Sequence, residues 1–194
     1  MLNNNWKKEI FTIPNLLSLF RLVLLPVYVC IYLNAEEPFQ FYTAGIVMAV
    51  SCVTDLIDGK IARHFHMVTT LGKILDPLAD KITQFTLTMC LSLKYPVLIP
   101  VLLLLLVKEL VQTTLGVHHL LHGKMLPGAL AAGKICTAVL FVSLITLVMF
   151  PKIHPETVVL IALTDSFFLI VSFFSYLSAY FGRHPLVEDL KRNG

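Results

Sequence analysis

The stretch that decides the fold reads Asp55-Leu-Ile-Asp58-Gly59-Lys-Ile-Ala62-Arg63 and, after eight more residues, Gly72-Lys-Ile-Leu-Asp76-Pro-Leu-Ala-Asp80. At about 100° per residue, each half places its polar and small residues on one face of a helix. These residues are Asp55, Asp58, Gly59 and Ala62 in the first half, and Gly72, Asp76 and Asp80 in the second. Two acidic faces joined by a short polar connection can converge on one site.

Carboxylates that lie this close repel one another unless a cation joins them. Hard oxygen ligands suit Mg²⁺, Ca²⁺ or Mn²⁺, so the four aspartates predict a metal site. Simpler readings exist for each aspartate taken alone. Asp55 and Asp58 fit a solvated helix end, and Asp76 before Pro77 fits an ordinary helix cap. Asp80 fits a pair with a neighbouring lysine, either Lys81 or Lys73.

The composition is that of a membrane protein. Of 194 residues, 57% are hydrophobic and only 14% are charged, whereas a soluble domain typically carries about 25% charged residues. The four cysteines all fall inside apolar runs, where they read as small buried hydrophobic residues: Cys30, Cys52, Cys90 and Cys136. The net charge of +3 is modest, and we expect no nucleic-acid partner.

The hydrophobic runs predict an all-α, polytopic membrane protein with six transmembrane helices, because each span needs about 20 apolar residues. The spans are expected at 14–33, 39–63, 72–95 (or beginning at 76), 97–117, 129–150 and 158–180. They form one catalytic domain over 13–182, preceded by an interfacial segment (1–12) and followed by a polar tail (183–194). The loop at 118–128 is expected to hold His118, His119 and His122, which could bind metal but more simply lie at an interface.

Charge predicts the orientation. An even number of spans puts both termini on one side, and of the 15 lysines and arginines only Lys94 and Lys152 fall on the opposite loops. Positive charge is retained in the cytoplasm. The termini and the acidic motif are therefore expected on the cytoplasmic side of the cell membrane.

The acidic stretch, written D-x2-D-G-x2-A-R-x8-G-x3-D-x3-D, resembles the signature of the CDP-alcohol phosphotransferases, integral membrane enzymes of phospholipid synthesis. The segment Ile13-Pro-Asn-Leu-Leu-Ser-Leu-Phe-Arg21 is similar to the amino-terminal segment of the bacterial phosphatidylglycerophosphate synthases. The resemblance covers most of the chain and is weakest in the second half. It implies the CDP-alcohol phosphotransferase fold and, with it, a homodimer in the lipid bilayer.

The resemblance also implies roles for single residues. The metal ligands of a two-metal Mg²⁺ or Mn²⁺ site would be Asp55, Asp58 and Asp76, with Asp80 as the base that takes the acceptor's proton and as a further metal contact. The pocket for the cytidine diphosphate group would be lined by Asp58, Gly59, Ala62, Arg63 and Gly72. In the first span Asn15, Ser18 and Arg21 form a polar stripe, which is either a wall of this pocket or plain end-of-helix polarity. The implied reaction moves a phosphatidyl group from CDP-diacylglycerol to an alcohol and releases CMP.

The acceptor alcohol is expected to meet basic residues: Arg21, Lys81, Lys108 and Lys134. Lys108-Glu109 stands where the phosphatidylglycerophosphate synthases tend to show Arg-Glu, although the pair could also be a buried ion pair that orients two helices. Gly133-Lys134-Ile-Cys136-Thr137 resembles their Gly-Lys-x-Lys-Thr, with cysteine for the second lysine. Glycerol 3-phosphate is the first expectation, and the less basic pocket leaves open phosphatidylglycerol, as in a cardiolipin synthase, or an inositol or serine acceptor.

Other classes of protein fit part of the pattern. A membrane ion carrier would explain intramembrane aspartates but not the glycines, alanine and arginine at fixed spacing. An inactive relative or a structural membrane subunit would also keep most of the residues. Asp165, in the last span, is expected near the outer leaflet, facing protein or water, with a partner across a dimer interface as one option.

Overall fold

The computed structural model describes residues 12–64, 72–121 and 131–181; within these ranges the side chains of 13–14, 55–64, 73–74 and 119–121 are not described. The described residues form helices joined by short connections, with a single 3-10 turn, η1 (Pro96–Leu98). Its α-helices are α2 (Ile13–Leu33), α3 (Pro38–His64), α4 (Gly72–Lys94), α5 (Ile99–Leu121), α6 (Ala131–Met149) and α7 (Pro155–Phe181). The predicted all-α class is confirmed, and the described residues form six α-helices, while the domain bounds stay a prediction.

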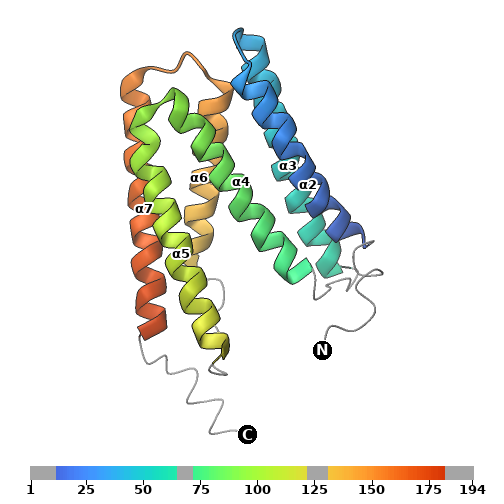
Figure 1. Ribbon diagram of the computed structural model, residues 1–194, viewed down its shortest axis with the longest axis vertical. Helices are drawn as coiled ribbons and strands as arrows, with labels where there is room; N and C mark the ends of the chain where they lie inside the picture. Colours follow the sequence, from blue (N-terminus) through green and yellow to red (C-terminus); the bar gives the residue numbers. More distant parts are fainter. Residues whose placement is uncertain (1–11, 65–71, 122–130, 182–194) are drawn as a thin grey trace, which may run out of the picture.

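Successive helices run in opposite directions (Figure 1). The first residues of α2 and the last residues of α7 therefore lie at the same end of the bundle. We call this the motif end, because the end of α3 and the beginning of α4 also lie there. The predicted interfacial segment, apart from Thr12, and the predicted tail lie outside the described residues.

Four segments within the described residues are long and apolar enough to cross a membrane: Asn15–Leu33, Pro96–His118, Ala131–Met149 and Pro155–Phe181. The first part of α3, Pro38–Thr54, is a shorter apolar helix. The 23 residues of α4 reach about 35 Å at 1.5 Å per residue, which is enough to span a hydrocarbon core of about 30 Å. Its polar residues lower its hydropathy, and they turn inward, as the site below shows.

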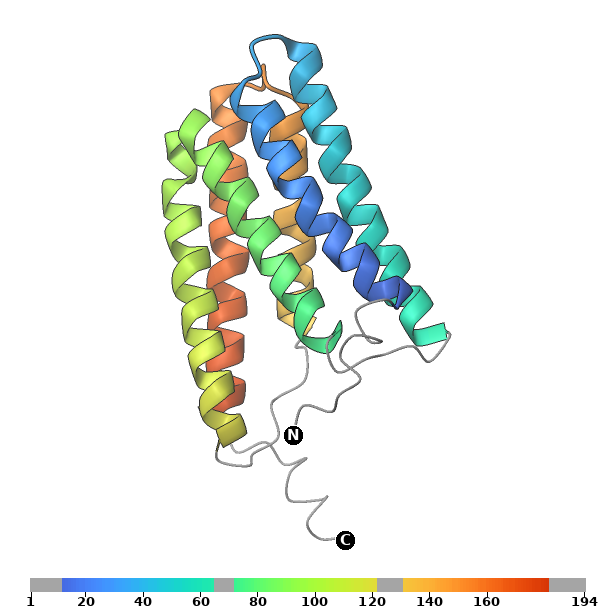
Figure 2. The same cartoon turned by 45° about the vertical axis from the view of Figure 1, so that its right-hand side comes forward.

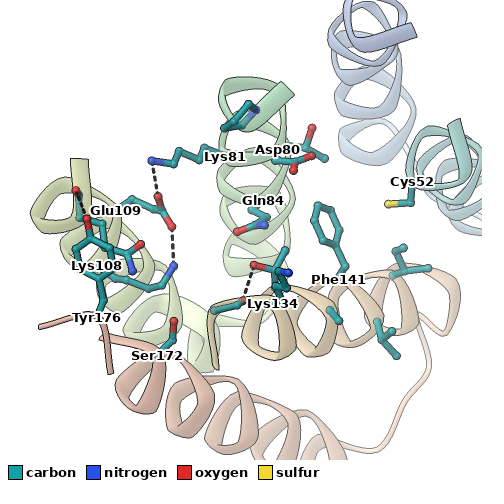
Figure 3. A pocket seen from close by; sticks show the side chains of 18 of the residues that line it. Cys52, Asp80, Lys81, Gln84, Lys108, Glu109, Lys134, Phe141, Ser172 and Tyr176 are labelled. Carbon is teal, nitrogen blue, oxygen red and sulfur yellow. Dashed lines mark hydrogen bonds and ion pairs between the residues drawn. The ribbon is translucent and has the colours of Figure 1, made fainter. Parts of the chain in front are cut away.

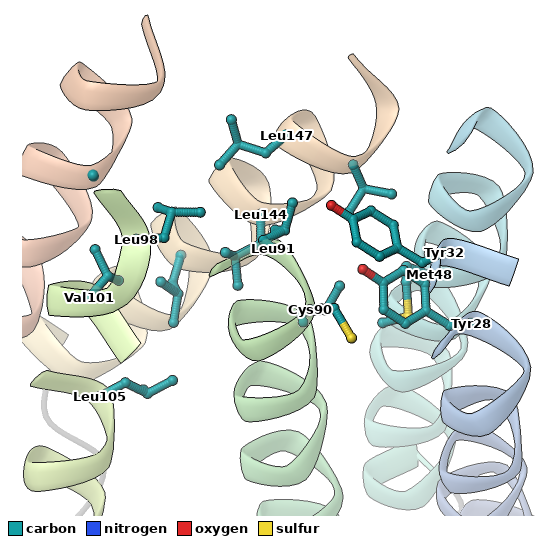
Figure 4. Packing of buried hydrophobic residues seen from close by; sticks show 14 of the residues in the cluster. Tyr28, Tyr32, Met48, Cys90, Leu91, Leu98, Val101, Leu105, Leu144 and Leu147 are labelled. Carbon is teal, nitrogen blue, oxygen red and sulfur yellow. The ribbon is translucent and has the colours of Figure 1, made fainter. Parts of the chain in front are cut away.

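The apolar core fills the half of the bundle far from the motif end. All the helices and η1 contribute to it, and Figure 4 shows its centre, where Tyr28, Met48, Leu91, Leu98 and Leu144 are buried. The rings of Tyr28 and Tyr32 stack with centroids 5.6 Å apart. The Tyr95 hydroxyl donates a 3.2 Å hydrogen bond to the Pro151 carbonyl and so joins the α4–α5 connection to the α6–α7 connection at this end.

One glycine sets the packing of α3 against α6. A Cβ atom built on Gly45 would lie 2.5 Å from the Cγ atom of Met149. Real Cβ atoms do not approach another atom so closely, so the Met149 side chain, whose Cα atom would be at an ordinary 3.6 Å, occupies space that only glycine leaves open at position 45. α2 packs against both α3 and α4, and α6 packs against α3 and α7 (Figures 1 and 2).

The structure corrects several expectations. α5 continues to Leu121, so His118 and His119 are helical rather than in a loop, while His122 lies outside the described residues. Helix α4 begins at Gly72, so the reading of Asp76-Pro77 as a helix cap is wrong. Pro77 lies inside α4, one turn after its start, where the helix continues although the proline ring has no N–H to donate to the carbonyl four residues earlier.

Two further expectations concern single side chains. Asp165 lies about ten residues into the 27-residue α7, about 15 Å from its start at 1.5 Å per residue, so it is near the middle of the span and not at the outer leaflet. It is 1% exposed within the chain, which also makes a partner across a dimer interface wrong. Of the four cysteines, Cys90 and Cys136 are buried as expected, but Cys30 is exposed and Cys52 is half-buried.

Candidate functional site

The polar stripe of α2 is buried inside the protein. Asn15, Ser18 and Arg21 are 1%, 0% and 2% exposed, so the interpretation as end-of-helix polarity is wrong. The Ser18 hydroxyl donates a hydrogen bond to the Asp76 carboxylate. The Arg21 guanidinium forms an ion pair with the Asp80 carboxylate. The stripe therefore faces α4 and holds both of its described acidic side chains.

Helix α4 presents the second half of the acidic motif on one face, as its spacing predicts. Gly72 is buried, and Asp76 and Asp80 follow at intervals of one turn. The side chain of Asp80 is 35% exposed, so it remains accessible from the cavity described below. The expected pairing of Asp80 with Lys81 is wrong, because Asp80 pairs with Arg21 and Lys81 pairs with Glu109. The side chain of Lys73 is outside the described residues.

The first half of the motif lies on α3, whose backbone is helical as far as His64. The side chains concerned, those of Asp55, Asp58, Gly59, Ala62 and Arg63, lie outside the described residues, so the metal and cytidine diphosphate roles stay predictions. Among the described side chains there is no group of three or more His, Cys, Asp or Glu residues that could hold a metal ion. Of the four predicted metal ligands, Asp76 and Asp80 are the two whose side chains are described. Their carboxylate oxygens are hard donors, which suit Mg²⁺ or Mn²⁺.

A cavity of about 720 Å³ opens beside Asp80. Every one of the described α-helices contributes to its lining. α2 contributes Arg21, α3 contributes Cys52, and α7 contributes Ser172 and Tyr176. The other lining residues lie at positions between Pro77 and Gln84 on α4, between Lys108 and Gln112 on α5, and between Gly133 and Ile145 on α6. Figure 3 shows Asp80 on one side of this cavity, with Lys81, Lys108 and Lys134 around it. The structure thus brings the predicted base and all the predicted acceptor-binding residues into one cavity.

One carboxylate joins two of the lysines. The Glu109 Oε1 atom lies 2.7 Å from the Nζ atom of Lys108, and its Oε2 atom lies 2.9 Å from the Nζ atom of Lys81. Lys81 also donates a 3.0 Å hydrogen bond to the Thr113 hydroxyl. Lys108 and Glu109 thus form the expected ion pair, but within α5; the contact that joins two helices is the one between Glu109 and Lys81 of α4, and all three residues line the cavity.

The cavity carries an excess of positive charge. Among the described residues, its lining holds four cationic and two acidic side chains, with Arg21 paired to Asp80 and both Lys81 and Lys108 sharing Glu109. Lys134, on the α6 wall, forms no ion pair with any described carboxylate. A cavity with an excess of positive charge attracts anions and raises the rate at which they bind.

Sequence reasoning missed several lining residues. Gln84 continues the four-residue recurrence of Gly72, Asp76 and Asp80 on α4, and Gln112 stands one turn after Lys108. That periodicity could have found both. Nothing in the sequence marks Tyr176, whose hydroxyl donates a 3.4 Å hydrogen bond to the Gln112 carbonyl and ties α7 to α5.

Three relatives show what the chain is similar to. It is 39% identical over 72 residues to the CDP-diacylglycerol–glycerol-3-phosphate 3-phosphatidyltransferase of Escherichia coli strain K12, and the aligned residues cover 37% of this chain and 39% of that protein. It is 40% identical over 76 residues to the cardiolipin synthase (CMP-forming) of Streptomyces coelicolor, which is 38% of this chain and 35% of that protein. It is 41% identical over 92 residues to a cardiolipin synthase (CMP-forming) / mitochondrial hydrolase fusion protein of Schizosaccharomyces pombe, which is 45% of this chain and 14% of that protein.

Each of these alignments covers less than two fifths of the relative's length. The family model described as CDP-alcohol phosphatidyltransferase reaches much further along this chain, since it matches residues 11–177. That range includes the acidic motif, the polar stripe of α2 and every residue that lines the cavity. The chain therefore belongs to the CDP-alcohol phosphatidyltransferase family.

Proposed function

We propose that the protein transfers a phosphatidyl group from CDP-diacylglycerol to an anionic alcohol, with glycerol 3-phosphate as the first acceptor, and releases CMP. The observation that carries this proposal is the position of Asp80 on the wall of a positively charged cavity. A base that removes a proton from an alcohol must lie within hydrogen-bond reach of it. An acceptor held in this cavity by its phosphate would place its hydroxyl near Asp80.

The reaction is a substitution at phosphorus. The acceptor oxygen forms a bond to the phosphorus that carries the diacylglycerol, while its proton goes to the Asp80 carboxylate. The bond from that phosphorus to the oxygen of the CMP phosphate breaks, and CMP leaves with the electron pair. Arg21 keeps the Asp80 carboxylate turned toward the cavity by its ion pair, so the base is oriented before the acceptor arrives.

The proposed binding sites for the metal ions and for the cytidine diphosphate group lie at the motif end. Asp55, Asp58 and Asp76, with Asp80, would hold Mg²⁺ or Mn²⁺, and the donor set of carboxylate oxygens fits these ions. Bound there, the ions would neutralise the charge of the diphosphate. Ser18 fixes one oxygen of Asp76 by a hydrogen bond. Gly59, Ala62, Arg63 and Gly72 would line the pocket for the cytidine diphosphate group, with Asn15 and Ser18 of α2 as its wall.

The charge of the cavity favours an acceptor that carries a phosphate. Lys134 has no described carboxylate partner, and Lys81 and Lys108 share only one. Inositol carries no charge and serine no net charge, so neither would compensate these cations. Glycerol 3-phosphate carries a charge of about −2 near neutral pH, as other phosphate monoesters do.

A second acceptor, phosphatidylglycerol, is favoured by the apolar part of the same cavity. Phe141, Val142 and Ile145 of α6 line it beyond Lys134, and Val142 is 68% exposed on the outside of the bundle. Acyl chains could lie along such a surface, whereas glycerol 3-phosphate has no use for it. With this acceptor the protein would be a cardiolipin synthase.

The proposed location is the cell membrane, with both termini and the site on the cytoplasmic side. Lys94 and Lys152 lie at the end of the bundle away from the motif end, and the other basic residues do not lie in the connections at that end. The rule that positive charge stays in the cytoplasm supports this orientation. A homodimer remains a proposal that rests on the family alone.

The test uses purified protein in detergent with labelled CDP-diacylglycerol and Mg²⁺. Glycerol 3-phosphate, phosphatidylglycerol, inositol and serine are supplied in turn, and CMP release is measured. We expect release with glycerol 3-phosphate and its loss in Asp80→Asn. Glu156→Gln is the control, because Glu156 is exposed at the start of α7 and far from the cavity.

Other outcomes would change the conclusion. Release with phosphatidylglycerol alone would assign the cardiolipin synthase reaction. Release with inositol or serine alone would contradict the anionic acceptor. No release with any acceptor from correctly folded protein would overturn the transferase, and a flux assay in vesicles would then test the ion carrier.

A further inference from the structure

Glu109 lies between two lysines on the wall of the cavity. It lies on α5, and each of its carboxylate oxygens contacts a different ammonium group, Lys108 on its own helix and Lys81 on α4. The three side chains form one cluster on the cavity wall opposite Lys134, as Figure 3 shows. We call them the lysine clamp: Lys81, Glu109 and Lys108.

The lysine clamp also bears on the proposed base. Lys81 directly follows Asp80 in the sequence, and the two side chains leave α4 toward different neighbours. Asp80 pairs with Arg21 of α2, and Lys81 pairs with Glu109 of α5. One turn of α4 is therefore held from both sides, so the clamp connects the helix that carries the base to the helix that carries Lys108.

We propose that Glu109 is a positioning residue that holds the ammonium groups of Lys81 and Lys108 at the spacing at which they bind the phosphate of the acceptor. This proposal rests on the proposed function, since it concerns the acceptor of that same reaction. A carboxylate that engages two ammonium groups through separate oxygens fixes two flexible side chains at once. The phosphate of an anionic acceptor then binds on the cavity side of the two lysines, with Lys134 reaching it from the opposite wall.

The opposite role is also conceivable and predicts the opposite result. If Glu109 only competed with the acceptor for the lysines, its removal would strengthen acceptor binding. Burial argues against this. Lys108 is 7% exposed, and two ammonium groups this close would repel each other without the carboxylate between them. Loss of Glu109 would separate the lysines and weaken the phosphate site.

The test compares Glu109→Gln and Glu109→Asp with wild type and with Glu156→Gln, a matched change at an exposed position. With the acceptor that supports CMP release, we expect Glu109→Gln to raise the acceptor KM about tenfold, the size of one lost charged hydrogen bond. The kcat and the KM for CDP-diacylglycerol should stay close to the wild-type values. Glu109→Asp keeps the charge on a shorter side chain and should give an intermediate acceptor KM.

Two results would overturn the inference. An acceptor KM that is unchanged or lower in Glu109→Gln would show that Glu109 does not position the lysines for the acceptor. A parallel loss of kcat and of CDP-diacylglycerol binding, with no change specific to the acceptor, would show a general structural role. If Glu109→Gln fails to fold, the same comparison is made with Glu109→Asp.

A binding measurement separates this inference from the proposed function. Glycerol 3-phosphate is titrated against wild type and Glu109→Gln, and the shift in thermal unfolding is recorded. Wild-type protein that binds glycerol 3-phosphate but releases no CMP would contradict the proposed reaction alone. Equal shifts in wild type and variant would contradict the positioning role alone.

Discussion

Arg21 of α2 forms an ion pair with Asp80 of α4 at the wall of the cavity, and the arginine is 2% exposed. An arginine inside a membrane protein is costly unless it faces a partner. Here that partner is the carboxylate that we propose as the base. The two helices are 59 residues apart in sequence at these positions, so the contact depends on the folded bundle.

Arg21→Gln should lower kcat about 100-fold, because a small displacement of a reacting group has effects of that size. The glutamine cannot keep the charge or the geometry that orients Asp80. CMP release under saturating substrates measures the effect, and Lys152→Gln, at an exposed position at the far end of the bundle, is the control. An Arg21→Gln variant with wild-type kcat would show that Asp80 needs no orientation by α2.

Lys134→Ala should raise the KM for an anionic acceptor about tenfold and leave the KM for CDP-diacylglycerol unchanged, as the loss of one charged contact predicts. Lys134 has no described carboxylate partner, so its removal leaves no acidic group uncompensated. Initial rates at varied acceptor concentration provide the measurement. Lys152→Ala is the matched control, and an equal effect in both variants would argue for bulk electrostatics rather than a contact.

Gly45→Ala should destabilise the protein by about 1–3 kcal/mol, because the added methyl group overpacks a close contact. The clash is with Met149, whose Cγ atom would lie 2.5 Å from the new Cβ atom. Thermal unfolding in detergent measures the change, and Met149→Ala in the same chain should restore part of the stability. Gly133→Ala is the control, since its nearest contact would be at 3.9 Å from the Ser172 hydroxyl; equal losses at both glycines would contradict the packing explanation.

Asp165→Asn should leave the unfolding temperature unchanged or raise it. Neither carboxylate oxygen of Asp165 has a hydrogen-bond partner among the described residues, and the side chain is 1% exposed. Burying an unpaired ionised carboxylate is costly, and a neutral amide of the same shape avoids that cost. A large loss of stability in Asp165→Asn, with no loss in Ser166→Ala as a neighbouring control, would show that the charge of Asp165 is required.

The proposed orientation can be measured with cysteine variants in a chain whose four cysteines are first replaced by serine. Lys152→Cys, in the connection between α6 and α7, should react in intact cells with a maleimide that does not cross membranes. Ala131→Cys, exposed at the start of α6 near the motif end, should react only after the cells are opened. The reverse pattern would invert the topology and place the site outside the cytoplasm.

Much of this fold follows from local sequence. The apolar runs fix the number of helices and their approximate bounds, because each run is close to the length of a bilayer span. The four-residue recurrence along α4 fixes which of its faces carries Asp76 and Asp80. The helix ends were harder to predict. α5 passes through Gly116 and continues through His118 and His119, because nothing in these two histidines stops a helix.

Local sequence patterns could not predict which distant side chains pair with the charged residues. Asp80 has Lys81 beside it in sequence, but consecutive residues on a helix point in different directions. Which distant side chain each one meets depends on how three helices pack, and so Arg21 and Glu109 emerged only from the structure. Cys30 was misjudged for a related reason: in a bilayer the outside of a helix is also apolar, so an apolar run does not tell the lipid-facing side from the core.

Because every described helix lines the cavity, the site is complete only when all six described helices have been synthesised. Ser172 and Tyr176 come from α7, which follows the other five described helices in the chain. Until α7 packs against α5 and α6, an unfinished chain would hold its lysines and Asp80 without their final wall. The proposed transfer activity should therefore begin only after α7 has been inserted, and a chain cut short before α7 should not attack lipid in the membrane where it is being made.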